Sequence, residues 1–233
     1  MTALLPLADE GEAADLAAFL SRLIHYDRAA AVRLQASSTT LAVFGRPPSF
    51  EVLAIRTARL AKPYENGLDV LLDVTVSAGE LLESIDESAA TAAVPGAVTG
   101  PPWAGVLPPR RGWRPEPGLP APDSVRAMVA AAVAEFRSRT QELPVEGRTR
   151  AELDRIGREI WSRPIGDTSL PVRAAHAAQS LGFLRPARPA RQGAPEESPL
   201  GLFSSGAWLR LRTPYGSIAV RGAGLGALDV SVR

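Results

Sequence analysis

A proline-rich stretch near the middle of the chain places the strongest limit on its fold. Nine of the 32 residues between positions 91 and 122 are proline. Proline has no backbone N–H and disfavours helix in the residue before it, so we expect no regular element there. An extended, polyproline-like path is the alternative that remains. The chain therefore divides into residues 1–90, the proline-rich segment 91–122 and residues 123–233.

The first part, residues 1–90, has the periodicities of a helix, four strands and a second helix. Apolar residues recur at helical spacing from Leu16 to Ile24. Four runs of alternating apolar and polar residues follow. The first begins at Ala30, and the fourth runs from Leu68 to Val76. Ser77 and Glu80 then form an S-x-x-E capping box, which predicts a short helix after them. The simplest arrangement is an antiparallel sheet with one face covered by helices.

The last part, residues 123–233, starts with three helical patterns. They span residues 124–142, 150–162 and 170–182, with Thr149 as a predicted cap of the second and Thr168 or Ser169 of the third. We expect an exposed loop over 185–199, then a hairpin, then a closing strand over 225–233. The fold class predicted from these patterns is α+β, with antiparallel sheets flanked by helices and two α+β parts joined by the proline-rich segment.

The hairpin is predicted within GAWLRLRTPYGSIAVRG, residues 206–222. Burying its apolar residues on one face pairs Leu211 with Ile218 and Leu209 with Val220. Because proline cannot take the positive φ that tight hairpin turns favour, we expect a four-residue loop from Thr213 to Gly216, with a left-handed glycine. The opposite, more exposed face then carries Trp208, Arg210, Arg212 and Arg221.

Residues 29–45 resemble this hairpin when the two are laid over each other without a gap. Six of the 17 positions are identical, including Arg33 with Arg210 and Gly45 with Gly222. Alternating strands resemble each other easily, so duplication and coincidence both stay open. The face that is basic in the second hairpin is not basic in the first, which favours an ordinary solvated surface over a nucleic-acid-binding wing.

Catalytic and metal-binding motifs are absent from the sequence. There is no cysteine, and the two histidines stand apart. We expect His25 to end the first helix and His176 to lie on the solvent face of the third helix of the last part. No P-loop, nucleophile elbow or H-E-x-x-H motif occurs. The sequence therefore predicts a protein that is not an enzyme and needs no cofactor or metal.

Charge and hydropathy limit the location and the partners of the protein. No apolar run reaches the roughly 20 residues that span a bilayer, and the N-terminus lacks a basic region before an apolar core. We therefore expect a cytoplasmic protein without a membrane partner. Residues 1–90 carry 7 basic and 13 acidic groups, and residues 123–233 carry 16 and 11. This asymmetry fits either a nucleic-acid-binding face or attraction between the two halves.

Two functions remain, and the oligomeric state is open under both. The first is a non-enzymatic interaction or scaffold protein with an unidentified protein partner. The second, less favoured, is a winged-helix-like DNA-binding protein built from the helices and hairpin of residues 123–222. The candidate interaction residues are Trp103, Trp113, Arg173, Arg210, Arg212 and Arg221. We expect both indoles, Trp103 and Trp113, to be mostly buried against the folded parts, because exposing a large apolar side chain costs about 1.5–3 kcal/mol.

Overall fold

The computed structural model describes residues 3–63, 72–186 and 200–222 of the chain. Its first part contains β1 (Leu4–Pro6), α1 (Glu10–Tyr26), β2 (Ala31–Ser37), β3 (Thr40–Gly45), the 3₁₀ helix η1 (Pro48–Phe50), β4 (Leu53–Arg59), β5 (Leu72–Ser77), α2 (Ala78–Glu83), β6 (Ile85–Asp86) and β7 (Thr91–Ala93). The 3₁₀ helix η2 (Pro102–Gly105) and β8 (Arg114–Glu116) follow. The second part contains α3 (Pro122–Glu142), the 3₁₀ helix η3 (Val145–Gly147), α4 (Arg150–Trp161), α5 (Val172–Ser180), β9 (Gly201–Ser205), β10 (Trp208–Thr213) and β11 (Gly216–Arg221).

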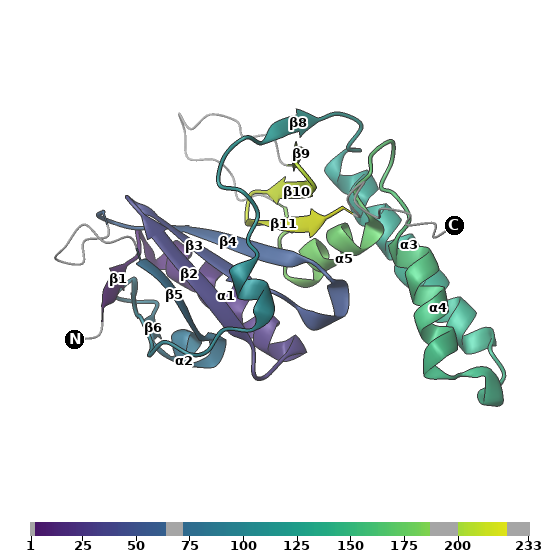
Figure 1. Cartoon of the computed structure of the whole chain (residues 1–233), viewed down its shortest axis with the longest axis horizontal. Coiled ribbons are helices and arrows are strands. Elements are labelled where there is room, and N and C mark those ends of the chain that lie inside the picture. The colour runs from purple at the N-terminus through teal and green to yellow at the C-terminus, as the bar shows by residue number, and fades with distance from the viewer. Residues whose placement is uncertain (1–2, 64–71, 187–199, 223–233) are drawn as a thin grey trace, which may run out of the picture.

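One large antiparallel sheet runs through both parts of the protein. Its strand order is β5-β2-β3-β4-β11-β10-β9-β8, and a small second sheet has the order β1-β7-β6. The two halves of the large sheet meet where β4 pairs with β11, with Ile55 opposite Ser217 and Leu53 opposite Ala219. Helices α3 and α4 extend from one end of the sheet as an arm (Figure 1). The predicted α+β class with antiparallel strands is confirmed.

The first part forms the elements that its periodicities predict. Asp9 caps α1 by accepting a hydrogen bond from the Glu12 backbone N–H at 3.0 Å. The predicted capping box is present, since the Ser77 hydroxyl accepts from the Glu80 N–H at 3.4 Å. β2, β3 and β5 pair in register, and their inward residues form a core with the apolar stripe of α1. The start of the fourth predicted strand, at Leu68, lies outside the described residues.

The hydrophobic core occupies mainly one face of the sheet and continues across both parts. On this inner face, the large sheet is covered by α1 in the first part and by α5 in the second, and α3 packs against α5. The outer face carries a smaller apolar cluster formed by Phe44, Leu53, Ile55 and Ala219. Helices therefore cover one face of the sheet, the inner one, as predicted. The outer face is covered in part by a segment without α-helices.

A segment of the proline-rich region covers part of the outer face, and we call residues 101–113 the strap. Trp103 and Leu107 of the strap pack on the outer apolar cluster. Arg33 of β2 donates a hydrogen bond to the Ala104 carbonyl and pairs with Asp73 at 2.7 Å, so a charged side chain holds the strap to the sheet. The strap is therefore docked on the sheet, and both of its ends contact strand residues.

The prediction that residues 91–122 form no regular element is wrong at three places. Pro102–Gly105 is the short 3₁₀ helix η2. Thr91–Ala93 is strand β7, and Arg114–Glu116 is strand β8, paired with β9 through Pro115 opposite Phe203. An edge strand tolerates proline, because a strand bonded on one side needs only every second N–H. The proline rule disfavours long helices and prolines inside an interior strand, and it excludes neither a proline on an edge strand nor a short 3₁₀ helix that begins at proline.

The helices of the second part follow the predicted order, with one different start. Thr149 caps α4 by accepting from the Glu152 N–H at 3.3 Å, as the capping box predicts. Neither Thr168 nor Ser169 caps α5, whose N-cap is Pro171, so that prediction is wrong. The Thr168 hydroxyl instead accepts from the Leu170 N–H at 3.1 Å and closes a turn before the helix. Most of the loop predicted over 185–199, namely residues 187–199, and the closing strand predicted over 225–233 lie outside the described residues.

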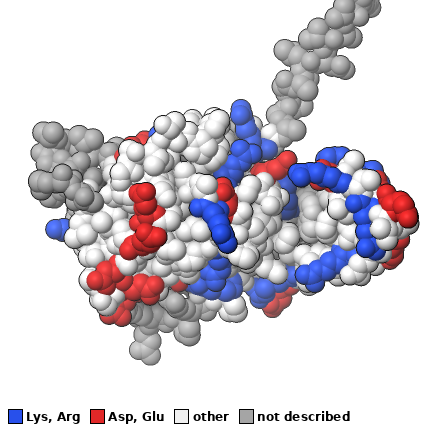
Figure 2. Space-filling view, turned by 90° about the horizontal axis from the view of Figure 1, so that it is seen from below, with Lys and Arg blue, Asp and Glu red and all other residues white. Residues whose placement is uncertain are grey.

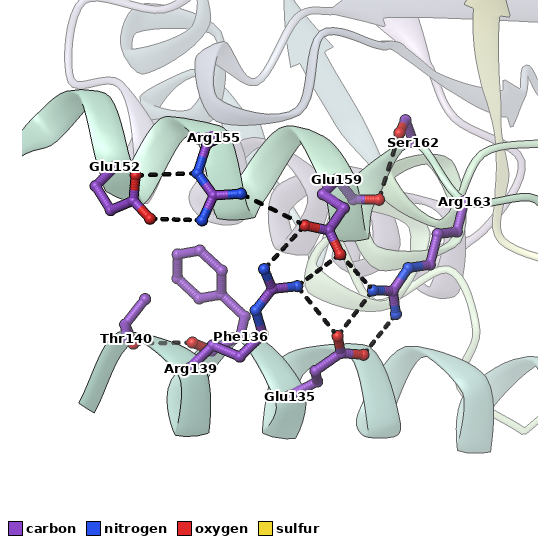
Figure 3. A network of polar contacts seen from close by, with 9 residues as sticks. All are labelled: Glu135, Phe136, Arg139, Thr140, Glu152, Arg155, Glu159, Ser162 and Arg163. Atoms are coloured by element: carbon purple, nitrogen blue, oxygen red, sulfur yellow. Dashed lines mark hydrogen bonds and ion pairs between the residues drawn. The ribbon is translucent and has the colours of Figure 1, made fainter. Parts of the chain in front are cut away.

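Charged side chains join α3 to α4 along the arm (Figure 3). Nη1 of Arg139 in α3 lies 2.7 Å from Oε1 of Glu159 in α4. Nη1 of Arg163, just after α4, lies 2.5 Å from Oε2 of Glu135 in α3. The hydrogen bond from Arg139 lowers the pKa of Glu159 to about 2. A single exposed ion pair contributes little to the stability of a fold, but several pairs in one network together hold the two helices in register.

A half-buried charged cluster joins the two parts on the inner side of the sheet. Arg56 of β4 is only 6 % exposed, and its Nη2 lies 2.8 Å from Oε2 of Glu12 and 3.6 Å from Oδ2 of Asp15. Its Nη1 donates a hydrogen bond of 3.1 Å to the Tyr215 carbonyl. Arg185, which belongs to the second part, forms an ion pair with Asp15, and its guanidinium carbon lies 3.6 Å from the centroid of the Tyr215 ring. The acidic first part and the basic second part therefore attract each other at this contact. Seen from below, acidic side chains gather over the first part and basic ones become frequent over the arm (Figure 2).

The register of the hairpin β10–β11 is the predicted one. Leu209 pairs with Val220 and Leu211 with Ile218, and Leu211 and Ile218 are fully buried. A one-residue slip would have placed arginines in the core, which explains why the apolar pattern alone determines the register.

The turn of this hairpin differs from the prediction. Thr213 pairs with Gly216, so the loop has two residues, Pro214 and Tyr215, and Gly216 has no positive φ. The Thr213 hydroxyl accepts from the Tyr215 N–H at 3.2 Å and donates to the Gly216 carbonyl at 2.9 Å. These bonds and the burial of Tyr215 stabilise a turn that the φ of proline disfavours in isolation.

The two similar hairpins close at different positions of their alignment. In β2–β3 the last pair is Ser37 with Thr40, whereas in β10–β11 it is Thr213 with Gly216. Laid over each other without a gap, these turns are one residue apart. The resemblance in sequence therefore does not extend to the pairing of the strands, and duplication stays an open interpretation.

Candidate interaction surface

Most of the predicted interaction residues lie together on the outer face of the second half of the sheet. Trp208, Arg210 and Arg212 alternate along β10 with residues that point to the core. Arg221 lies opposite Trp208, and Phe203 lies opposite Arg210. Directly opposite residues of an antiparallel pair share a face. We call this surface the basic–aromatic face; it consists of Trp113, Phe203, Trp208, Arg210, Arg212 and Arg221.

Arginine and aromatic side chains stack on one another across this face. The guanidinium carbon of Arg210 lies 5.7 Å from the centroid of the Trp113 ring, and that of Arg212 lies 4.9 Å from the Phe203 ring. Both distances are within the roughly 6 Å over which a cation and a π system attract. The Trp113 indole N–H donates to the Pro109 carbonyl at 2.9 Å, which orients the ring.

Among the described residues, the positive charge of Arg210 and Arg212 has no counter-ion on this face. Neither arginine forms an ion pair with a carboxylate in the part of the chain that the structure describes. The Nε of Arg210 is buried and has no hydrogen-bond partner. Burial, and then the neighbouring charge of Arg212, lower the pKa of Arg210 from its usual value. An approaching anion would relieve both effects, since a buried unpaired charge is costly.

The exposure of the predicted residues is mixed. Arg212 and Arg221 are exposed as expected, whereas Arg210 is half-buried beneath Trp113. Trp103 and Trp113 are both docked and more than half of each is buried, so the expectation of mostly buried indoles is confirmed, although neither is fully buried. Trp103 belongs to the outer apolar cluster together with Trp208. The strap therefore connects this cluster to the basic–aromatic face.

The hairpin does not have the free position that a DNA-binding wing needs. β10 pairs with β9 and β11 pairs with β4, so the hairpin lies inside the sheet. Its tip is fastened as well, since Tyr215 is 8 % exposed and its hydroxyl donates to the Pro186 carbonyl at 3.0 Å. A recognition helix would have to be α5, and its alanines at positions 174, 175, 177 and 178 are fully buried.

Two family models match adjacent segments of the chain. Residues 108–225 match the family described as Domain of unknown function (DUF8185), and residues 1–105 match Domain of unknown function (DUF8010). The first match covers more than half of the chain. The chain belongs to the DUF8185 family. No curated protein and no solved structure matches it.

The boundary between the two matches lies within the strap. The basic–aromatic face belongs wholly to the DUF8185 segment, whereas Trp103 belongs to the DUF8010 segment. Because β4 and β11 pair across this boundary, the two segments share a sheet even though separate family models describe them.

Two predicted interaction residues lie outside this face: Trp103 packs on the outer apolar cluster, and Arg173 lies on another side of the protein. Arg173 belongs to α5 of the DUF8185 segment and lines a groove between α4, α5 and the η1 loop. His176 lines the same groove and packs between Trp161 and Phe50, so its predicted place on the solvent face is wrong. This groove could not be predicted from the sequence, because Phe50 and Trp161 are distant in sequence and each occupies an ordinary apolar position.

In the described ranges, no helix is both long and apolar enough to cross a bilayer. Across those ranges, no three histidine, aspartate or glutamate side chains form a group that could hold a metal ion.

Proposed function

We propose that the protein is a non-enzymatic interaction protein that binds an acidic surface of a partner protein through the basic–aromatic face. The observation that supports it is the pair Arg210 and Arg212, which share one face and have no carboxylate partner among the described residues. Carboxylates of a partner would supply the missing counter-ions and could accept two parallel hydrogen bonds from each guanidinium.

The composition of the face agrees with a protein interface. Binding energy at such interfaces concentrates in tryptophan, tyrosine and arginine, and the face holds Trp113 and Trp208 beside its arginines. The stacking of Arg210 on Trp113 and of Arg212 on Phe203 limits the rotamers of these side chains before a partner arrives. Such preorganisation lowers the entropy cost of binding. The absence of cysteine favours a cytoplasmic site of action for this proposal.

Nucleic acid is the second candidate for the same face. The specific observation in its favour is the alternation of arginine with aromatic rings, since bases stack on aromatic side chains while phosphates bind arginine. This version replaces the winged-helix arrangement, whose wing and recognition helix are both packed within the fold.

Site-specific photocrosslinking in the cells that make the protein tests both candidates. The photoreactive residue p-benzoylphenylalanine replaces Arg221, which is exposed and lies opposite Trp208. The matched control carries it at Glu87, an exposed turn position of the first part. We expect a discrete protein adduct from position 221 only, and its loss in the R210Q/R212Q double variant. Exposed substitutions change stability by about 0.5 kcal/mol or less, so the fold should tolerate the change at position 221.

Each other outcome has a defined meaning. An adduct that nuclease digestion removes supports nucleic acid in place of a partner protein. Adducts that are equal at positions 221 and 87, or unaffected by R210Q/R212Q, contradict an interaction through this face.

A further inference from the structure

A groove separate from the basic–aromatic face has the features of a small-molecule site. It has a volume of about 850 Å³ and lies between α4, α5 and the η1 loop. Pockets of about 300–1,000 Å³ with apolar walls and a few polar groups are typical of ligand sites. We call it the aromatic groove; its walls carry Phe50, Phe136, Leu153, Trp161 and His176.

The rings of the aromatic groove form a continuous series. Phe136 of α3 lies 5.6 Å from Trp161 of α4, and Trp161 stacks on His176 of α5 at 4.7 Å. Phe50 of η1 meets His176 edge-on at 5.1 Å, so the series joins both parts of the protein. Gly157 of α4 also lines the groove, and a side chain there would meet the Trp161 ring at 3.4 Å. The missing side chain keeps this wall open.

The polar lining of the groove has an excess of unpaired positive charge. Arg173 has a buried Nε without a hydrogen-bond partner, and Arg158 forms no ion pair among the described residues. Two carboxylates also line the groove, Glu51 and Asp154, and Asp154 lies 3.8 Å from Arg150. An unsatisfied buried donor costs free energy that an anionic acceptor would recover.

From these observations we infer that the aromatic groove binds a small organic anion with an apolar, ring-sized body. The anionic group lies on Arg173, with Arg158 at the rim, and the apolar body lies against Trp161 and Phe136. Burial lowers the pKa of His176, so its imidazole is neutral at pH 7 and serves as part of the apolar wall. Among the described residues, the groove lining has two arginines without an ion pair, Arg158 and Arg173, and one carboxylate without an ion pair, Glu51. The excess charge is therefore positive, and an anion matches it.

A matched pair of fluorescent probes tests this inference on the full chain. Anilinonaphthalene sulfonate carries a sulfonate on an aromatic body, and N-phenylnaphthylamine has nearly the same body without the charge. We expect saturable binding of the sulfonate and weaker binding of the neutral probe. The R173Q variant should bind the sulfonate about ten-fold or more weakly, because it loses a charge-assisted hydrogen bond, and the neutral probe unchanged.

Control variants keep the test decisive if R173Q folds poorly. R158Q alters an exposed lining residue and should weaken sulfonate binding with the fold intact. R137Q removes an exposed arginine of α3 outside the groove and should change nothing. NMR signals of the His176 ring should shift on addition of the sulfonate.

Three results would overturn the inference. The first is no saturable sulfonate binding by the wild-type chain. The second is equal binding by R173Q, R158Q and R137Q with no shift of the His176 signals. The third is displacement of the probe by an acidic, leucine-bearing peptide that binds more tightly than naphthalene sulfonates, which would make a peptide the occupant.

Discussion

Gly216 lies where the hairpin packs closely against the segment that follows α5. The sequence suggests that this glycine provides a left-handed turn conformation, yet its φ is not positive. A Cβ at this position would lie 2.6 Å from Cζ of Phe183, a fully packed residue at the end of α5. Phe183 in turn stacks on Phe19 of α1 at 5.6 Å. The glycine therefore provides room for a ring that links α1, α5 and the hairpin.

The Gly216→Ala variant should be destabilised by about 1–3 kcal/mol, the usual cost of adding a methyl group to a packed core. Urea denaturation of the purified chain measures the change. Gly96→Ala is the control, because nothing lies within 4 Å of a Cβ at position 96. Equal free energies of unfolding for the two variants would show that Phe183 moves aside at no cost.

The burial of His176 makes part of the stability depend on pH. Its pKa is lowered in the folded protein from the usual 6.5, because burial disfavours the charged form. As the pH falls below about 6.5, the unfolded chain takes up a proton that the folded chain does not, and stability decreases. We expect the unfolding midpoint to fall between pH 7 and pH 5, and this part of the fall to be absent in H176F. A wild-type and an H176F curve of the same slope would contradict the assignment.

At the scale of elements, the α3–α4 arm depends on both apolar packing and charge. Ile156 and Ile160 of α4 are buried, and Phe136 contacts Trp161 between the two helices. The charged network lies at the surface beside them (Figure 3). Hydrogen bonds from arginine lower the pKa of Glu135, Glu152 and Glu159, each pKa moving down from 4.5. The lowered pKa values predict that the network is lost in acid.

Because the pKa of Glu159 is about 2 in the folded chain, its contribution is complete above about pH 4.5 and is lost as the pH falls toward 2. The E159Q variant should therefore melt below the wild type at pH 7, by a small margin typical of exposed pairs. Thermal unfolding at a series of pH values should show this difference shrinking toward pH 2. A difference that is constant over this range would mean that the charge of Glu159 is not involved.

At the scale of the whole molecule, one sheet unites two segments that match different families. The pairing of β4 with β11 satisfies two strand edges and covers Ala219, which is fully buried. Arg56 adds a second connection, from β4 to the carboxylates of α1 and to the hairpin tip. An exposed apolar strand edge is an aggregation site, so each segment protects the other.

Residues 1–105 and 106–233, produced separately, should each be unstable or aggregate, and should form a stable complex when they are produced together. Size-exclusion chromatography and urea unfolding measure both properties. If each fragment unfolds cooperatively by itself at the midpoint of the full chain, the shared sheet contributes nothing to stability.

Features that depend on local pattern could be predicted from the sequence. The capping boxes at Ser77 and Thr149 and the pairing of Leu211 with Ile218 are present as expected. A cap needs only a side chain and an N–H three residues away, and a register needs only alternation. Trp208, Arg210, Arg212 and Arg221 share one strand face as the alternation predicts, whereas the place of Phe203 and the stacking of Arg210 on Trp113 could not be predicted, because they join positions far apart in the chain.

Tertiary structure alone decided the features that depend on contacts between distant segments. The meeting of β4 with β11, the edge strand at Pro115 and the turn at Pro214 each require a partner that the local sequence does not specify. The aromatic groove belongs to the same class, since Phe50 and His176 meet only after both parts have folded. Local propensities differ by about 1 kcal/mol or less per residue, whereas burying a large side chain is worth about 1.5–3 kcal/mol, so packing prevails where the two disagree.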